Sequence, residues 1–324
     1  MRSKVAIVGA GNVGATCAQR ILEQGIADVA LIDVVDGLAA GKALDLAEAA
    51  PLEGHDGKII GSTAYEGAKG AQVAVITAGL ARKPGMSRSD LLEANAKILQ
   101  SIVPPLKAAA SQAILIVVTN PLDVMTYLAW KLAGWPAQRV MGMAGVLDSA
   151  RLRFFVAERL KVSVREVQAL VLGGHGDSMV PLPQYTTVSG VPLPELLSKP
   201  EIDALLQRTR DGGAEVVKLL KTGSAFYAPA SSVADMVQAI LLDEKRLLPA
   251  CVQLNGPYGL KEIFCGVPIR LGAGGVEEII EVSLTPEEKA ALSKSAQAVQ
   301  EEMQAIDALL ENLKGSDPFY LKGV

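Results

Sequence analysis

Short segments rich in valine and isoleucine alternate with longer stretches rich in alanine and leucine along the first half of the chain. The short segments are Val5–Val8, Val29–Ile32, Val73–Thr77, Ile114–Thr119 and Arg139–Met143, and the longer ones are Ala15–Gln24, Ala39–Ala49, Leu91–Ala110 and Val124–Leu132. Uniformly apolar strands that alternate with helices indicate a parallel sheet covered on both faces. Because such crossovers are right-handed, we expect an α/β fold with a doubly wound parallel sheet.

The pattern changes near residue 145, so we expect a first domain of residues 1–145 and a second of residues 146–324. The second part predicts helices at Leu147–Leu160, Glu201–Leu220 and Ala230–Leu242, and strands at Val167–Leu172 and within Ala250–Leu284. The last of these segments is rich in Gly, Val and Ile and contains the turn signal Asn255-Gly256, which favours antiparallel strands. The second domain is therefore expected to be α+β.

The final helix has a clear predicted start. Thr285 is the expected N-cap, Pro286 the first helical residue, and Glu288 completes a capping box. Apolar side chains then recur at steps of three and four, and they are Leu292, Val299, Met303, Ile306, Leu310 and Leu313. We interpret this stripe as a face packed on the core rather than as a coil that binds a partner.

A glycine-rich turn, Gly9-Ala10-Gly11-Asn12-Val13-Gly14, joins the first predicted strand to the first predicted helix. This GxGxxG spacing in a strand–turn–helix context is the dinucleotide-binding fingerprint of a Rossmann sheet. Gly9 permits a tight turn, Gly11 lets a pyrophosphate approach the backbone, and Gly14 lets helix and strand pack closely. The start of the helix offers unpaired N–H groups to that anion.

Asp33 ends the second predicted strand, nineteen residues after Gly14. A carboxylate at this place accepts hydrogen bonds from the adenosine ribose and repels a 2′-phosphate. The pattern therefore predicts NAD rather than NADP as the cofactor, although a residue that only caps a loop is the alternative.

Charge and composition exclude several other classes of protein. The net charge is −4, and no basic run is long enough to follow a phosphate backbone, so we expect no nucleic-acid partner. No apolar run reaches the roughly 18 residues of a membrane helix, and Val5–Val8 is too short for a signal peptide. The three cysteines lack CxxC spacing, so we expect no metal site and a cytoplasmic location.

The chain has two histidines, which are the natural proton carriers near neutral pH. His55 lies in a polar turn and is expected to be solvated. His175 lies in Gly173-Gly174-His175-Gly176-Asp177-Ser178, where the glycines leave the ring open to a substrate. A surface histidine in a turn remains the alternative for His175.

Asp148 and Arg151 lie three residues apart at the start of a predicted helix, so they share one face. They either form a simple ion pair or have two separate functional roles. In the second case Asp148 orients a histidine and Arg151 grips a carboxylate with its guanidinium.

Two further segments follow predicted strands, where doubly wound sheets bind their ligands. The loop Ala81–Arg88 contains three cations, Arg82, Lys83 and Arg88, and is either an anion-binding loop or a solvated basic one. Thr119-Asn120-Pro121 follows the next strand, and Asn120 either offers an amide to a substrate oxygen or only forms a turn.

Taken together, these motifs resemble the malate and lactate dehydrogenase family nearly end to end. The shared motifs are Gly9–Gly14, Asp33, Ala81–Arg88, Val118–Pro121, Leu147–Arg151 and Gly174–Ser178. The resemblance implies NAD-dependent hydride transfer to or from a small 2-hydroxy acid. It also implies that the second domain supplies the catalytic and substrate-binding residues.

The resemblance assigns roles to the candidate residues. It implies that His175 accepts the proton in alcohol oxidation with Asp148 as its partner, that Arg151 binds the carboxylate beside the reacting carbon, and that Arg88 polarises the carbonyl from a closing loop. It further implies that Asn120 contacts substrate and nicotinamide, and that Asn95, Val118, Thr119 and Asn120 line the cofactor site.

Arg82 is the residue from which we predict the substrate. In this family lactate enzymes usually carry Gln at this loop position and malate enzymes carry Arg, which suits the second carboxylate of oxaloacetate. Lys221–Pro229 resembles the lactate-dehydrogenase-like branch of the malate enzymes, and Ala225 replaces the Thr usual in lactate enzymes. We therefore expect oxidation of (S)-malate to oxaloacetate, as in the tricarboxylic acid cycle, by a homotetramer or homodimer. A lactate or broad 2-hydroxy acid dehydrogenase is the alternative enzyme, and an NAD-binding sensor without turnover is the alternative outside the enzymes.

Overall fold

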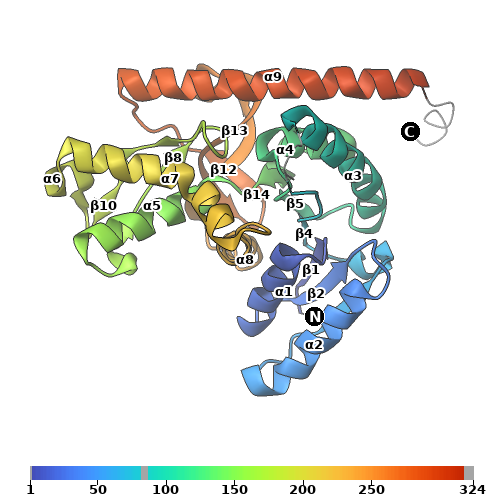
Figure 1. Ribbon diagram of the computed structural model, residues 1–324. Coiled ribbons are helices and arrows are strands. Elements are labelled where there is room, and N and C mark those ends of the chain that lie inside the picture. Colours follow the sequence, from blue (N-terminus) through green and yellow to red (C-terminus); the bar gives the residue numbers. More distant parts are fainter. Residues whose placement is uncertain (1, 82–86, 317–324) are drawn as a thin grey trace.

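The computed structural model describes residues 2–81 and 87–316, with the side chains of Arg88 and of residues 312–316 outside the description. Its main feature is a nine-stranded sheet with the order β14-β13-β12-β6-β5-β4-β1-β2-β3 (Figure 1). The six strands from β3 to β6 are all parallel and follow the order 3-2-1-4-5-6. This confirms the predicted doubly wound sheet, whose order reverses between β1 and β4.

The parallel strands and their helices lie close to the predicted ranges. The strands are β1 (Lys4–Val8), β2 (Asp28–Ile32), β3 (Ile59–Ser62), β4 (Val73–Ile76), β5 (Ile114–Val117) and β6 (Val140–Gly142), and the helices are α1 (Asn12–Glu23), α2 (Leu38–Glu53), α3 (Arg88–Ala109) and α4 (Leu122–Ala133). The sequence analysis missed β3. This strand is a half-exposed edge of the sheet and contains Gly61, so it lacks the apolar run that marks the central strands.

The second part of the chain contains both helices and small sheets. The helices are α5 (Gly145–Leu160), α6 (Leu193–Leu196), α7 (Lys199–Leu220), α8 (Tyr227–Leu241) and α9 (Pro286–Ser316). The strands are β7 (Val167–Gln168), β8 (Val171–Leu172), β9 (Val180–Pro181), β10 (Thr187–Val188), β11 (Val191–Pro192), β12 (Arg246–Asn255), β13 (Lys261–Gly272) and β14 (Gly275–Ile279). This mixture confirms the predicted α+β character.

The structure differs from the sequence analysis at two places in this part. The single strand expected at Val167–Leu172 is two strands, because β7 pairs with β10 whereas β8 pairs with β9. The antiparallel strands β12–β14 also do not form a separate sheet. They extend the parallel sheet, since β12 pairs with β6 at Cys251 and Gly142.

Helix α9 begins with the predicted capping box. The Thr285 N–H donates to the Glu288 carboxylate at 2.9 Å, and the Glu288 N–H donates to Thr285 Oγ1 at 3.2 Å. The helix runs across α3 and α4 (Figure 1), and the predicted stripe is buried in the main core from Leu292 to Leu310. The expectation of a packed face is therefore confirmed for the described part of the stripe.

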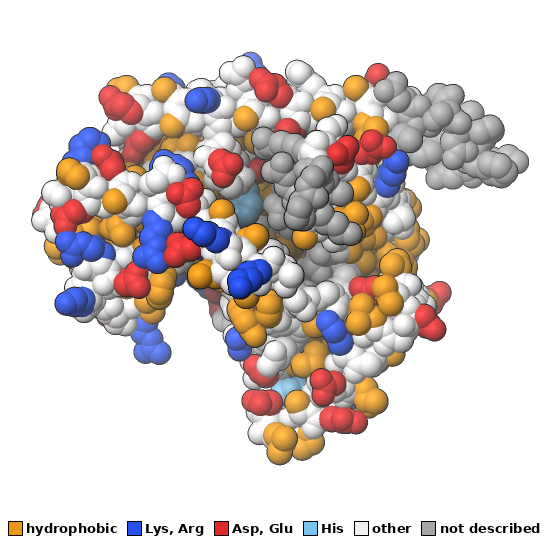
Figure 2. Space-filling view, viewed as in Figure 1, with side chains coloured by type: hydrophobic (Ala, Val, Ile, Leu, Met, Phe, Trp, Pro, Cys, Tyr) orange, Lys and Arg blue, Asp and Glu red, His pale blue; other side chains and the backbone are white. Residues whose placement is uncertain are grey.

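Two apolar cores meet at α5. The main core surrounds the large sheet and includes Leu147 at the start of α5. A smaller core includes Leu152 and Phe155 of the same helix and packs against α6 and α7. Figure 2 shows a hollow between the part of the surface over α1 and α2 and the part over α5 to α7. Helix α5 therefore reaches from the sheet into the second part of the molecule, and it carries Asp148 and Arg151.

Candidate active site

The glycine-rich turn has the geometry that its sequence predicts. Gly9 has φ +108°, and a Cβ there would lie 2.5 Å from the Ala78 nitrogen. A Cβ on Gly14 would lie 1.9 Å from the Gly9 carbonyl oxygen, so a side chain would separate helix from strand. At Gly11, in contrast, no described atom lies within 4 Å of the Cβ position, and no side chain caps α1 there. The helix start thus offers open N–H groups that fit a pyrophosphate.

Asp33 lies directly beside this turn at the end of β2. Its Oδ2 accepts a hydrogen bond from the Ala10 N–H at 2.6 Å, and its Oδ1 accepts one from the Val35 N–H at 3.0 Å. Lys42 of α2, which the sequence analysis did not single out, donates from Nζ to the Ala10 carbonyl at 2.7 Å. Asp33 therefore organises its own loop and also presents a carboxylate at the edge of the predicted nucleotide site.

Asn95 of α3 is fully buried and joins the loops that follow β4 and β5. Its side-chain amide donates to the carbonyls of Leu80 and Asn120, at 3.2 and 2.6 Å, and its Oδ1 accepts from the Leu80 N–H. Thr119 adds a bond from Oγ1 to the Ala78 carbonyl at 2.6 Å. The buried Asn95 thus holds the two loops together, whereas Asn120 is exposed to solvent. The Val118 N–H donates to the Ile76 carbonyl, and Val118 is half-buried.

The structure describes only part of the Ala81–Arg88 loop, which contains two predicted substrate-binding arginines. Arg82 lies outside the described residues. Arg88 is the first residue of α3, where Ser87 and Asp90 form a capping box, but its side chain is not described. The structure therefore fixes only where this loop ends, at the carboxyl edge of the sheet.

His175 and Asp148 are brought together by the fold although they are 27 residues apart. The ring Nδ1 of His175 lies 2.9 Å from Asp148 Oδ2, and the two side chains are 16% and 2% exposed. Because Asp148 occupies Nδ1, the other ring nitrogen, Nε2, is left for a substrate. His55, by comparison, is half-buried and accepts a hydrogen bond from the Gly57 N–H, outside this group.

The surroundings of His175 favour its charged form. Burial of the imidazole acts to lower its pKa, and the positive charge of Arg151 acts in the same direction. The charge and hydrogen bond of Asp148 and the charge of Asp123 outweigh them, so the pKa of His175 lies above its ordinary value. The raised pKa favours the protonated imidazole, which can give its proton to a substrate oxygen.

Arg151 shares the same carboxylate. Its guanidinium Nη1 lies 3.3 Å from Asp148 Oδ1, so Asp148 binds His175 with one oxygen and Arg151 with the other. The predicted ion pair therefore forms, and the same carboxylate also binds a histidine, while the binding of a substrate carboxylate by Arg151 stays a prediction. The side chain of Arg151 runs along Gly212 and Gly213 of α7, where a Cβ on Gly212 would lie 3.2 Å from the arginine Cδ.

These two glycines are functional neighbours that the sequence analysis missed. Two successive glycines inside a helix cost about 1 kcal/mol each relative to alanine. Such a pair indicates a packing reason, and here the reason is the room that it leaves for the Arg151 side chain.

The His175 loop is held by three backbone N–H groups in a row. Gly173 donates to the Gly266 carbonyl at 2.9 Å, Gly174 donates to Ser295 Oγ at 2.8 Å, and His175 donates to Asp123 Oδ2 at 2.8 Å. Asp123 lies three residues after Asn120, in the first turn of α4. It therefore connects the loop that follows β5 to the histidine.

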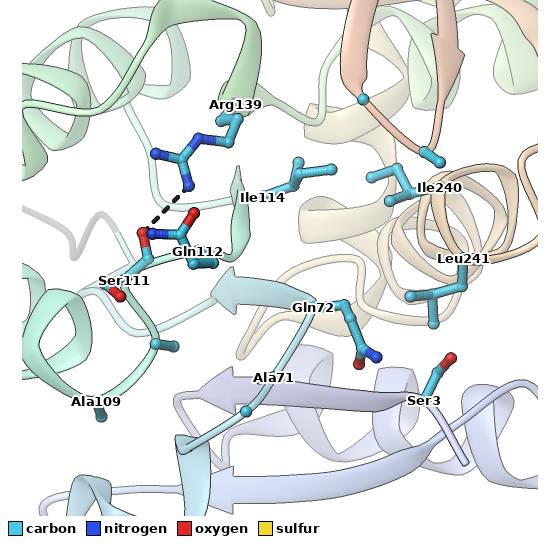
Figure 3. Close-up of a pocket in the computed structure, with 14 residues that line it drawn as sticks. Ser3, Ala71, Gln72, Ala109, Ser111, Gln112, Ile114, Arg139, Ile240 and Leu241 are labelled. Atoms are coloured by element: carbon cyan, nitrogen blue, oxygen red, sulfur yellow. Dashed lines mark hydrogen bonds between the residues drawn. The ribbon is translucent and has the colours of Figure 1, made fainter. Parts of the chain in front are cut away.

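A cavity of about 520 Å³ lies away from all these residues (Figure 3). Its lining includes Ser3, Gln72 and Ile114, which stand at the amino ends of β1, β4 and β5, whereas the site described above lies at the carboxyl ends. Arg139 reaches its rim and donates to the Ser111 carbonyl at 3.1 Å. The cavity therefore takes no part in the candidate active site.

Within residues 2–81 and 87–316, no cluster of three or more His, Cys, Asp and Glu side chains is arranged to hold a metal ion. Over the same ranges, no helix combines the length and the apolar character that crossing a membrane requires.

Family profiles match the chain in two consecutive parts. The NAD-binding domain of lactate/malate dehydrogenases matches residues 3–142, and the α/β C-terminal domain of the same enzymes matches residues 145–310. The chain therefore belongs to the lactate/malate dehydrogenase family, whose members are oxidoreductases, as its motifs predicted.

Similar sequences and structures carry the more specific name of malate dehydrogenase. The chain is 59% identical over 297 residues to that of Synechocystis sp. (92% of each chain), and 57% identical over 309 residues to that of Thermomicrobium roseum (95% of this chain and 100% of the relative). Malate dehydrogenase from Salinibacter ruber superimposes with a TM-score of 0.92 at 47% identity (95% and 99% covered). Lactate dehydrogenase from Cryptosporidium parvum, solved with lactic acid and NAD, has a TM-score of 0.92 at 39% identity (95% and 98% covered).

Proposed function

We propose that this chain catalyses the reversible NAD-dependent oxidation of (S)-malate to oxaloacetate. The observation that carries the proposal is Asp148, which binds the proposed proton carrier His175 and the proposed carboxylate receptor Arg151 at the same time. Relatives of more than 50% identity that are named malate dehydrogenase support malate as the substrate.

The residues of the nucleotide site fit NAD. The open backbone at Gly11 and the start of α1 fit the pyrophosphate, and Asp33 fits the adenosine ribose. We assign Gly9, Ala10, Gly11, Asn12, Val13 and Gly14, with Asn120, Val118 and Thr119, to the lining of this site, and Asn95 to its support. When bound, NAD supplies the hydride acceptor.

The protein's own residues bind the substrate and move its proton. Arg151 binds the carboxylate beside the reacting carbon, Arg82 the distal carboxylate, and Arg88 and Asn120 contact the reacting oxygen. In malate oxidation neutral His175 takes the hydroxyl proton at Nε2 as the C–O bond becomes a carbonyl. In oxaloacetate reduction protonated His175 returns that proton.

The experiment that tests this function follows NADH in both directions over a pH series. Since reduction needs protonated His175 and oxidation needs neutral His175, reduction should slow and oxidation should accelerate as pH rises through the histidine pKa. Because the pKa of His175 is raised, the pH at which the two rates change should lie above the ordinary pKa of histidine. Parallel pH profiles in the two directions, or no NADH consumption with oxaloacetate, would contradict the proposal.

The choice between NAD and NADP is predicted to depend on Asp33. The native protein should use NADH far better than NADPH, and Asp33→Ser should narrow the ratio by about tenfold or more, because a carboxylate no longer repels the 2′-phosphate. Steady-state kinetics with both cofactors measure this ratio. Lys42→Gln is the matched control, since it also removes a contact to Ala10 and should not narrow the ratio. Equal use of both cofactors by the native protein would show that Asp33 has no such role.

The setting of the enzyme is part of the same proposal. We propose at least a dimer, because large apolar side chains lie on the surface of α2 and α8, with Leu52 89% and Tyr227 64% exposed. Sedimentation as a monomer at micromolar concentration would contradict this.

The three cysteines are buried and form no disulfide, which supports a reducing compartment. We propose that the enzyme works in the cytoplasm, in the tricarboxylic acid cycle. We also propose that residues 1–145 form the NAD-binding domain and that residues 146–324 form the catalytic and substrate domain, with Arg82, Arg88 and Asn120 of the first domain completing the substrate site.

A further inference from the structure

Asp123 is a buried carboxylate at the back of the candidate active site. It is 5% exposed, and its Oδ2 accepts the hydrogen bond from the His175 N–H at 2.8 Å. Its Oδ1 has no hydrogen-bond partner among the described residues. A buried carboxylate with an unsatisfied oxygen destabilises a fold, so its presence beside the proton carrier calls for a physical reason.

Helix α5, strands β12 and β13 and the His175 loop contribute the titratable groups near this carboxylate. The titratable and charged groups that face Asp123 and His175 are Asp148 and Arg151 of α5, Cys251 of β12, Cys265 of β13, and the two residues themselves. Burial raises the pKa of Asp123, while the hydrogen bonds from the His175 N–H and the Cys251 thiol and the charge of His175 oppose that rise without cancelling it. The two buried thiols carry no positive charge. Protonated His175 is therefore the cation whose charge stabilises an ionised Asp123.

We propose that Asp123 is a positioning residue for His175, and that its negative charge as well as its hydrogen bond serves proton transfer. This inference rests on the proposed role of His175 as the proton carrier. Asp148 then acts on the ring through Nδ1, and Asp123 acts from the backbone side of the same residue.

The neighbouring anchor shows why the charge matters. Gly174 is held by Ser295, which is 2% exposed and uncharged, through a bond of the same length, 2.8 Å. A neutral acceptor is thus sufficient to hold this loop. A carboxylate at the next residue adds a negative charge that favours the imidazolium form of His175.

The test measures the charge of His175 directly, without turnover. The chain has only two histidines, so the His55→Asn protein gives a single ring C2-proton signal in an NMR titration. In that background Asp123→Asn keeps the size and an acceptor oxygen but removes the charge. We expect its titration midpoint to move to lower pH. Ser295→Ala removes the other anchor without a change of charge and should leave the midpoint in place.

Kinetics provide the second arm. In Asp123→Asn, oxaloacetate reduction should fall roughly threefold or more at pH 8 relative to the native enzyme, with a smaller change at pH 6, since fewer histidines hold a proton at the higher pH. In Ser295→Ala, any loss should be equal at both pH values. If Asp123→Asn does not fold, the same NMR titration and the same rates at pH 6 and pH 8 are measured with Asp123→Ser, whose hydroxyl is also a neutral acceptor, and the same changes are expected.

The outcomes separate this inference from the proposed function. An unmoved NMR midpoint in the neutral variant overturns the role of the Asp123 charge, whatever happens to activity. A midpoint that moves while the pH profile of turnover stays unchanged shows that the Asp123 charge acts on His175, but it contradicts both a role of that charge in turnover and His175 as the kinetically important proton carrier. Movement of both together supports both proposals.

Discussion

Oxaloacetate reduction by the His175→Asn variant is expected to fall by about a thousandfold or more. General acid catalysis contributes roughly 10²–10⁴ in rate, and asparagine cannot carry the proton. Its amide is still able to hydrogen-bond Asp148, so the buried carboxylate keeps a partner and the fold should survive. Stopped-flow or steady-state measurement of NADH consumption gives the rate.

The other histidine supplies the control for this variant. His55 accepts a hydrogen bond from Gly57 through Nδ1 and lies outside the site, and the Oδ1 of asparagine can replace that acceptor. His55→Asn should therefore retain nearly full activity. NADH should bind to His175→Asn within about threefold of its native affinity, because the predicted nucleotide site is untouched. Near-normal turnover in His175→Asn would show that another group carries the proton.

The second large effect concerns substrate choice at Arg82. In a closed site a guanidinium facing the distal carboxylate of oxaloacetate makes charge-assisted hydrogen bonds worth roughly 1.5–3 kcal/mol. Facing the methyl group of pyruvate, the same guanidinium is desolvated without a partner, which adds a penalty of similar size. Together these terms correspond to about a thousandfold discrimination in kcat/KM, or roughly 4 kcal/mol.

Replacing Arg82 with Gln removes both terms at once. Arg82→Gln should lower kcat/KM for oxaloacetate and raise it for pyruvate, and the rise is the diagnostic effect, since mere loss of a contact leaves pyruvate unchanged. Lys83→Gln removes a neighbouring cation of the same loop and should leave the ratio as it is. An unchanged ratio in Arg82→Gln would show that Arg82 does not face the distal group.

The parts of the fold that depend on local pattern were predicted well from the sequence. The apolar runs around Val5–Val8 and Val73–Thr77 are buried strands, and the GxGxxG turn has the tight contacts expected of Gly9 and Gly14. The start of α9 at Pro286 follows from a capping box whose residues are neighbours in sequence. In each case the interaction that stabilises the structure lies within a few residues of the motif.

Of the contacts between distant segments, the family resemblance implied only the pairing of His175 with Asp148. Asp148 and Arg151 were expected to share a helix face, but only the fold shows that one carboxylate binds both Arg151 and His175. The support from Asp123 and Ser295 comes from 52 and 121 residues away. Local periodicity carries no record of such pairs. A carboxylate just after Asn120-Pro121 at a strand end was the available signal for Asp123.

The extension of the sheet was missed for the same reason. The antiparallel strands β12–β14 were recognised by their composition and by the turn at Asn255-Gly256. Their attachment to β6 consists of the pairing of Cys251 with Gly142, and neither residue indicates that partner in its own surroundings. A boundary drawn at residue 145 from sequence therefore does not divide the sheet, which continues across it.

The most direct measurement of the central claim is the pair of kcat/KM values for oxaloacetate and pyruvate with NADH in the native protein. The account predicts that oxaloacetate is preferred by about a thousandfold or more. Comparable efficiencies for the two substrates, or a preference for pyruvate, would contradict it.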